Sequence, residues 1–343
     1  MFVTDSEPVF ENKTLSAWLE QSFLGRSILF DEAEPKARNA VRQIGTNAIP
    51  FLIESARAET STFQKILSRV SEKQSLVSVP FQDSSDVNHS HNLAVRGFSI
   101  LGPAGASAVP DLRKLLKSDD FDLRTTAAFC LAQIGPAAAP AVPELSQMLS
   151  RNTNSIDVFY AAYALGRMGE AARPAVRALM DAAKRKSAIG EGTVAELAVI
   201  RITGQTLDPF LERLKDTSHS REWIGAAGAL SILGTDAEPA IPMMLSALQQ
   251  TNQNIVMVAL RNLGIIRRQP DTCIPQIIPF LTSTNVIIRR NAMLVVRRFG
   301  SAARPARADV LEHLHDPDFR VRVEATNSLN QIDSQAGDNI TVK

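Results

Sequence analysis

A nine-residue phrase recurs along this chain, and its spacing constrains the fold more than any other feature. Residues 135–143 (GPAAAPAVP) return with changes as residues 169–176 (GEAARPAV), 234–242 (GTDAEPAIP) and 300–306 (GSAARPA). Weaker copies begin at four further glycines, which are Gly45, Gly102, Gly204 and Gly264. From Gly102 onward the intervals between these glycines are 33, 34, 35, 30, 30 and 36 residues. A near-constant period of this length is typical of a repeat array, in which each unit packs only on its neighbours.

One unit, residues 119–150, has the pattern of a helical hairpin. Apolar side chains recur at spacings of three and four between Leu123 and Ile134, which predicts one α-helix. Asp119 or Asp120 can cap its free N–H groups, and a left-handed turn at Gly135 can end it. The two prolines that follow predict the start of a second helix, whose first N–H groups need no intrahelical partner.

The same pattern predicts hairpins along the rest of the chain. First helices are expected over residues 92–101, 156–168, 223–233, 255–263, 286–299 and 319–332. Second helices are expected over residues 109–117, 176–186, 241–250, 274–281 and 306–315, with a shorter unit around residues 194–214. Alternation with a period of two is almost absent, so the sequence predicts an all-α fold with essentially no sheet.

Two segments carry a resemblance to a known family. Residues 120–128 (DFDLRTTAA) through Gly135, and residues 318–325 (DFRVRVEA), resemble HEAT repeats of the short bacterial form also found in phycobilisome lyase-like proteins. The resemblance covers about residues 34–333, and the tetratricopeptide and ankyrin signatures do not occur. It implies a right-handed α-α superhelix, a solenoid of the armadillo/HEAT type with about eight hairpins.

The chain departs from that family in two respects. The period is shorter than the roughly 40–47 residues of HEAT units. Arg124, Arg289 and Arg322 share one repeat position, at which other units have Val, Trp or Gln. The ladder of Asp–Arg pairs that such arrays carry is therefore expected to be incomplete.

The uneven period predicts the organisation of the chain. Residues 1–30 form a lead-in with a capping helix, in which Trp18 is expected to plug the end of the array, and residues 31–58 form the first repeat. Gly45 and Gly102 are 57 residues apart, which indicates an insertion, partly irregular, over residues 59–92. Residues 93–333 form the remaining array, and residues 334–343 a disordered tail.

Composition and charge bound the function. The 37 basic and 36 acidic residues give a net charge of +1, without the basic excess that is usual in a dedicated nucleic-acid binder. No run of about 18 apolar residues and no secretory signal is evident, so we expect a cytoplasmic, monomeric protein as given, with export of a longer precursor left open. Cys130 falls where other repeats have Ala or Val, so it is expected in the core rather than at a reactive site.

Residues that could support catalysis or metal binding are sparse. The insertion contains metal-ligand types close together, namely Asp83, Asp86, His89 and His91, but no matching His-Glu pairs occur elsewhere. His313 and His315 lie near a helix end, where we expect capping of carbonyl groups. We therefore predict no catalytic residue, no metal and no cofactor. A bilin-lyase-like enzyme subunit is the enzymatic alternative that the resemblance implies, and no residue can be assigned that role.

A second alternative is nucleic-acid binding, since DNA glycosylases are also built on HEAT-like helices. Residues 255–325 contain eleven Arg, no Lys and six acidic residues. The candidate contacts are Arg289, Arg290, Arg297 and Arg298. Neighbouring arginines on one helix point about 100° apart. We therefore expect at most one of Arg289 and Arg290 to bond between repeats, the other being free.

The favoured interpretation is a non-catalytic scaffold that binds another protein, with nucleic acid not expected. Repeat arrays offer a long concave binding surface, which we expect the second helices to line. Aligning the repeats gives the candidate partner contacts, which are Asp111, Lys114, Glu144, Gln147, Asp181, Met243, Ser246 and Glu312. Their mixed charges predict a polar, selective groove.

Overall fold

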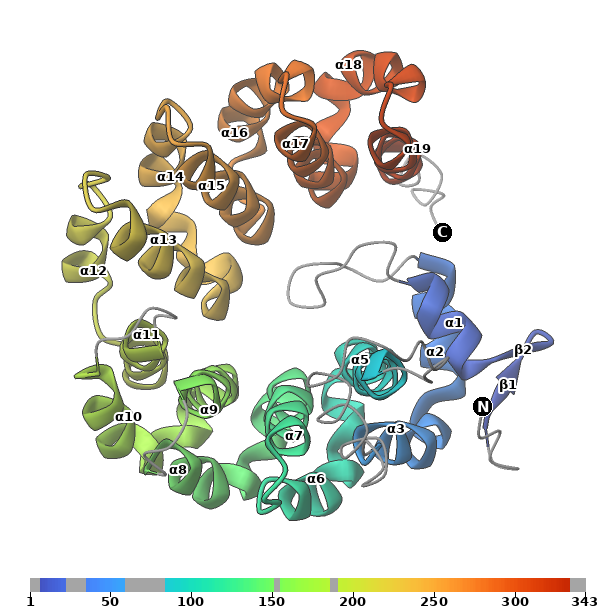
Figure 1. The fold of residues 1–343 in the computed structure, drawn as a ribbon, viewed down its shortest axis with the longest axis vertical. Helices are drawn as coiled ribbons and strands as arrows, with labels where there is room; N and C mark the ends of the chain where they lie inside the picture. The colour runs from blue at the N-terminus through green and yellow to red at the C-terminus, as the bar shows by residue number, and fades with distance from the viewer. Residues whose placement is uncertain (1–6, 23–34, 59–83, 151–154, 186–190, 334–343) are drawn as a thin grey trace, which may run out of the picture. The chain divides into compact units, whose positions relative to one another are not determined.

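The computed structural model describes residues 7–22, 35–58, 84–150, 155–185 and 191–333. It divides into two compact units, each described by itself below. Unit 1 comprises residues 1–185 and 201–203, and unit 2 comprises residues 186–200 and 204–343. Within each unit, successive helices pack side by side in two layers (Figure 1), so the expected all-α helical-repeat fold is confirmed. Most of the expected insertion (59–83) and the expected tail (334–343) lie outside the described residues.

Unit 1 begins with a small hairpin of two-residue strands, β1 (Val9–Phe10) and β2 (Lys13–Thr14). Its helices are α1 (Leu15–Ser22), α2 (Pro35–Ile44), α3 (Ile49–Ala56), α5 (Ser84–Leu101), α6 (Val109–Leu115), α7 (Phe121–Ile134), α8 (Val142–Ser150), α9 (Ser155–Met168) and α10 (Val176–Ala183). The recurring phrase forms 3-10 turns between the helices of a hairpin: η1 (Gly45–Ala48), η2 (Gly102–Ala108), η3 (Gly135–Ala141) and η4 (Gly169–Ala175).

Unit 2 continues the pattern with shorter second helices. Its helices are α11 (Glu191–Thr203, whose last three residues belong to unit 1), α12 (Asp208–Arg213), α13 (Ser220–Ala229), α14 (Ile241–Ala247), α15 (Gln253–Ile266), α16 (Pro270–Ile277), α17 (Val286–Phe299), α18 (Arg307–Glu312) and α19 (Phe319–Asp333). Its 3-10 segments are η5 (Leu230–Ile232), η6 (Gly234–Ala240), η7 (Ile278–Thr282), η8 (Gly300–Ala306) and η9 (His313–His315).

The start and end of α7 show why these residues form these helices. The Asp120 carboxylate accepts hydrogen bonds from the backbone N–H groups of Asp122 (2.9 Å) and Leu123 (3.4 Å), so Asp120 is the capping residue. Gly135 ends the helix with φ 72°, a left-handed conformation that costs a residue without Cβ little. The first glycine of six other copies of the phrase also has positive φ.

Gly264 does not serve as such a turn, although it lies where the repeat predicts one. Helix α15 runs through it to Ile266, and the left-handed residues are Arg267 (φ 48°) and Gln269 (φ 51°). A Cβ at Gly264 would lie 3.2 Å from side-chain atoms of Val295 and Arg298 in α17. The glycine at this position therefore permits close helix packing rather than a turn.

Helix α1 and the strand pair before it lie at one end of unit 1. Trp18 is 6% exposed, and its indole N–H donates to the Phe10 carbonyl at 3.0 Å. Lys13 lies over the Trp18 ring, 4.5 Å from its centroid. Helix α1 packs on α2 and α5, so the strand pair and the capping helix together close this end of the core.

The prediction that the second helices line the concave face is wrong. In each unit the first helices of the hairpins, such as α7, α9, α15 and α17, lie on the inner side of the arc, and the second helices lie outside (Figure 1). The first helices include fully buried alanines, among them Ala128 and Ala161. Small side chains let neighbouring helices approach closely, which favours curvature toward the layer that contains them.

Among the described residues, one run, residues 121–150, is long and apolar enough to cross a membrane, judged by length and by the composition of its most apolar 18-residue window. The sequence had indicated no such run. In the structure 72% of that window is buried, and Gly135 divides it into α7, η3 and α8. It has the character of a core hairpin, for which the same composition is ordinary.

Candidate functional site

Ion pairs connect successive repeats through the shared arginine position. In unit 1, Arg124 of α7 donates from Nε (3.3 Å) and Nη2 (2.9 Å) to Oδ2 of Asp157 in α9. Its Nη1 donates to the carbonyls of Ser118 and Asp119, in the loop before its own helix. The Arg124 and Asp157 side chains are 12% and 1% exposed. This arginine therefore holds its own loop and the next repeat at once.

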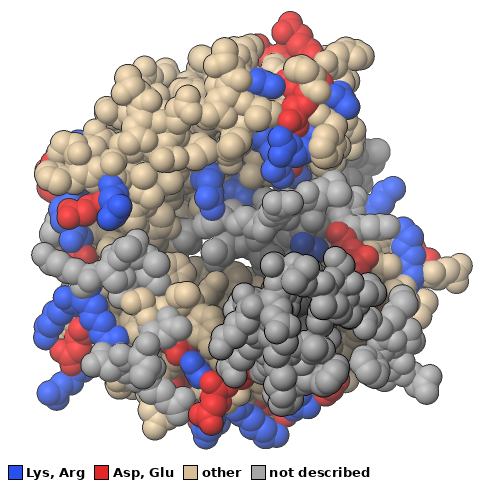
Figure 2. Space-filling view, viewed as in Figure 1, with Lys and Arg blue, Asp and Glu red and all other residues tan. Residues whose placement is uncertain are grey.

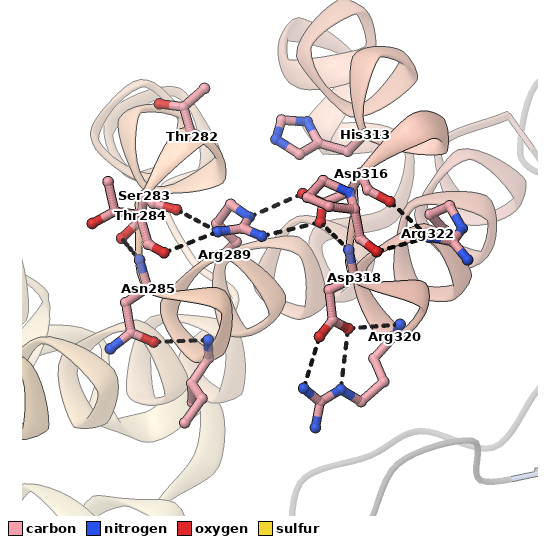
Figure 3. A network of polar contacts seen from close by, with 12 residues as sticks. Thr282, Ser283, Thr284, Asn285, Arg289, His313, Asp316, Asp318, Arg320 and Arg322 are labelled. Atoms are coloured by element: carbon pink, nitrogen blue, oxygen red, sulfur yellow. Dashed lines mark hydrogen bonds and ion pairs between the residues drawn. The ribbon is translucent and has the colours of Figure 1, made fainter.

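Arg289 makes the same arrangement in unit 2, as Figure 3 shows. Its Nε and Nη2 donate to the two carboxylate oxygens of Asp316 at 2.9 and 3.0 Å, and its Nη1 donates to the carbonyls of Ser283 and Thr284. Burial alone would raise the pKa of Asp316. The hydrogen bonds and charge of Arg289, together with the amide of Asp318, outweigh that effect and lower the pKa.

The other candidate nucleic-acid contacts also face the protein. Glu324 of α19 is 2% exposed and lies 3.9 Å from Nη2 of Arg290 and 3.4 Å from Nη1 of Arg297. Arg298 is half-buried. The expectation that one of Arg289 and Arg290 would be free is therefore wrong. Arg289 pairs with Asp316, and Arg290 pairs with Glu324 of α19, so both arginines contact carboxylates of the next repeat.

The candidate partner contacts lie on the second helices, which form the outer layer. Asp111 accepts hydrogen bonds from Lys114 (3.0 Å) and Arg57 (2.9 Å), and the Lys114 bond is the main cause of its lowered pKa. Asp181 pairs with Lys184 at 2.8 Å on the surface of α10. In unit 2, Ser246 and Glu312 are exposed and Met243 is half-buried.

Glu144 differs from the other candidates because it is buried. It is 8% exposed and accepts two hydrogen bonds from Arg113, at 2.8 and 3.1 Å, which lower its pKa. Lys117 lies 3.4 Å from the same carboxylate. Glu144 thus joins α6 to α8. A depression of about 330 Å³ beside it is lined by Lys117, Pro143, Glu144, Ser146, Gln147, Ser150 and Ala178.

An aromatic cluster on the inner layer of unit 1 was not predicted from the sequence. The ring of Phe129 in α7 lies 5.5 Å from that of Tyr160 and 5.9 Å from that of Tyr163, both in α9. The ring of Phe159 lies 5.5 Å from that of Tyr160. These are the separations of favourable edge-to-face and tilted ring pairs. We call these four residues, together with the 39% exposed Ile156, the aromatic surface.

The members of the aromatic surface differ in exposure. Phe129 (8% exposed) and Tyr163 (6%) are its buried members, whereas Phe159 and Tyr160 are half-buried and Ile156 is exposed. Burial raises the pKa of Tyr163, opposed by Arg167 and by a hydrogen bond from Gln133. Tyr160 and Tyr163 are the only two tyrosines of the chain. Ile156, Tyr160 and Tyr163 are four and three residues apart, so their spacing alone indicates one shared face of a helix.

The remaining polar candidates contact the protein itself. His89 Nε2 lies 3.0 Å from Glu20, and His91 is buried with its Nε2 2.8 Å from the Ala58 carbonyl. His313 Nδ1 lies 2.8 Å from the Asp309 carbonyl, the capping contact expected of it. The described residues contain no group of three His, Cys, Asp or Glu side chains that could hold a metal ion. Cys130 is fully buried, as expected, and burial raises its pKa.

Comparisons with known proteins identify no family. No protein-family model matches the sequence, and no curated protein matches it. Two crystal structures of engineered proteins from the Northeast Structural Genomics Consortium are similar to the chain. One has 24% sequence identity and a TM-score of 0.33 and covers 66% of this chain and 96% of its own. The other has 19% identity and a TM-score of 0.34 and covers 93% and 88%. The helical-repeat assignment rests on the helices of the chain itself.

Proposed function

We propose that this chain is a HEAT-like repeat scaffold that binds another protein through the inner layer of helices in unit 1. The observation that carries the proposal is the aromatic surface on α7 and α9. Tyrosine and other aromatic side chains are enriched at the centres of protein interfaces, where their large rings bury area and the phenol can still bond. Only 6% of the chain is aromatic, yet four aromatic rings gather here.

The packing beneath the aromatic surface favours binding. Tyr160 lies between the buried ring of Phe129 and the ring of Phe159, each 5.5 Å away, so its ring is ordered before a partner arrives. A side chain that is already ordered loses little conformational entropy on binding, which favours affinity. Asp122, in the first turn of the neighbouring helix α7, is an exposed acidic side chain. An aromatic centre with a polar rim is typical of protein-protein interfaces.

Internal pairing of the charges supports a protein partner over a nucleic acid. Nucleic-acid affinity depends on basic groups that are available to phosphates. Arg289 and Arg297 have side chains only 13% and 14% exposed, and both pair with carboxylates. In Figure 2, acidic and basic side chains lie next to one another where α18 and α19 end unit 2. The lyase-like alternative still has no residue to which a role can be assigned.

Site-specific photocrosslinking tests the proposal. A benzoylphenylalanine is placed at Tyr160 on the inner layer or, as matched controls, at Gln147 or Ser246 on exposed outer positions. After irradiation in lysate, we expect a discrete protein adduct at position 160 that is absent or much weaker at 147 and 246. Adducts of equal yield at all three positions, or none at 160, would contradict an interface on the aromatic surface.

A further inference from the structure

One side of α19 carries Phe319, Arg322, Val323 and Thr326, and we call it the outer stripe of this helix. It has the features of an interface between repeats, but no described residue covers it. Arg322 stands at the repeat position of Arg124 and Arg289. Its Nη1 donates to the carbonyls of Asp316 (2.8 Å) and Pro317 (3.1 Å), as the Nη1 of the other two does to their own loops. Figure 3 shows Arg289 and Arg322 on the two sides of the Asp316 loop.

The second edge of the guanidinium distinguishes Arg322 from the other two arginines. In Arg124 and Arg289, the Nε and Nη2 edge holds a carboxylate of the next repeat, Asp157 or Asp316. Among the described residues no carboxylate pairs with Arg322, and the side chain is exposed. Because Nη1 is already anchored, the Nε and Nη2 edge is fixed in direction, which favours two-point binding of a carboxylate.

The stripe beside Arg322 is uncovered as well. Phe319 is 63% exposed and Val323 is 41% exposed, and with the exposed Thr326 they recur at helical spacing along α19. When α19 is aligned on α7 through the shared arginine, Thr326 falls on Ala128, which is fully buried in the array. Positions that an internal repeat covers are therefore open to solvent here.

We propose that the outer stripe of α19 docks a helix of a partner protein whose first turn carries an acidic residue. The carboxylate binds the Nε and Nη2 edge of Arg322, as Asp157 binds Arg124. Apolar side chains of the same partner helix cover Phe319 and Val323. Charge complementarity to Arg322 and the two internal examples of the pair identify the partner by chemistry. This docking surface is in unit 2 and does not depend on the aromatic surface of unit 1, so either can fail alone.

The helix that α7 receives provides the probe. An acetylated peptide of residues 155–168, with added lysines at its carboxyl end for solubility, carries Asp157 in its first turn. Its binding to the whole chain is measured by fluorescence anisotropy. We expect saturable binding that weakens at least about tenfold with Arg322→Ala, equally with an Asp157→Asn peptide, and no further when both changes are combined. Arg322→Lys should weaken binding by an intermediate amount, because it keeps the charge but loses the fork.

A matched control lies two residues away. Arg320 pairs with Asp318 at 2.8 Å, so Arg320→Ala should leave peptide affinity within about twofold. Circular dichroism of each variant verifies that the helices are retained. Absence of binding, or binding that neither Arg322→Ala nor Asp157→Asn weakens, would overturn the proposal.

Two further measurements test whether the outer stripe is covered by the chain itself or by a second copy of it, instead of by a partner helix. If residues 334–343 of the chain itself cover it, a chain ending at residue 333 will bind the peptide at least about tenfold more tightly. If a second copy covers it, sedimentation will show a dimer that Arg322→Ala dissociates. Either result would overturn the assignment to a partner helix, and we expect neither.

Discussion

Arg289 and Asp316 form a two-point ion pair across a repeat boundary, with Nε–Oδ2 and Nη2–Oδ1 distances of 2.9 and 3.0 Å. The two side chains are 13% and 5% exposed. The same guanidinium holds the loop carbonyls of Ser283 and Thr284. One arginine therefore fixes both a helix start and the neighbouring repeat, which makes the pair structural rather than available to a ligand.

Arg289→Ala is expected to lower the free energy of unfolding by about 3 kcal/mol, because it leaves a buried carboxylate without its cation. Because the Arg289 side chain keeps 13% exposure, the loss lies at the low end of the range for buried pairs. Arg320→Ala, whose pair with Asp318 is 49% and 21% exposed, is the matched control and should lower the free energy of unfolding far less. Denaturant unfolding monitored by circular dichroism measures both. Equal losses would contradict the structural role of Arg289.

The lowered pKa of Asp316 predicts an acid-dependent loss of stability. Its folded pKa lies below the ordinary value of 3.8, so the ionised form stabilises the folded state above that value. The contribution is lost as the pH falls below about 4 and through the folded pKa. Asp316→Asn should therefore flatten the stability profile in that window, and Arg289→Ala should flatten it similarly. A steep profile that both variants retain would assign the acid sensitivity to other groups.

Two glycines in first helices predict opposite effects of added Cβ atoms. At Gly97 in α5 a Cβ would overlap the side chain of Leu52, so Gly97→Ala should destabilise by about 1–3 kcal/mol. At Gly225 in α13 nothing lies within 4 Å, so Gly225→Ala should stabilise by up to about 1 kcal/mol. Thermal unfolding of the two variants provides the measurement. The packing described for α5 would be wrong if Gly97→Ala were as stable as Gly225→Ala.

Much of the fold could be predicted from the sequence because its signals are local. Helix spacing, the Asp120 cap and the left-handed Gly135 each depend on a few neighbouring residues. Gly264 was misplaced because a glycine can permit close packing as well as a turn, and only the contact with α17 distinguishes the two. The helices that line the concave face were predicted wrongly. The direction of curvature depends on how closely the helices of successive repeats pack in each layer, and the sequence of a single repeat does not contain that information.

The candidate sites were harder to predict, because pairing across repeats is not local. Glu144 aligned with outward positions, yet Arg113 and Lys117 from the preceding hairpin cover it. Arg290 was expected to be free, and Glu324 of α19 pairs with it. The aromatic surface was missed because ring contacts join α7 to α9, while each aromatic residue alone is typical of a core.

Internal pairing of the arginines predicts weak nucleic-acid binding. Fluorescence anisotropy with a labelled DNA duplex and a labelled RNA strand should show no submicromolar binding at about 0.15 M salt. Submicromolar binding that falls steeply with salt, and that Arg290→Ala abolishes, would favour the nucleic-acid alternative. Arg290 suits this test because it is 34% exposed, the more accessible of the two arginines paired with Glu324.

Hydrogen exchange of the chain with and without its captured partner tests the central claim most directly, that the aromatic surface binds another protein. The account predicts that the partner slows exchange in α7 (Phe121–Ile134) and α9 (Ser155–Met168), and that Tyr160→Ala abolishes this protection while the helical content is unchanged. Protection confined to the outer helices α6, α8 and α10, or protection that Tyr160→Ala leaves intact, would contradict it.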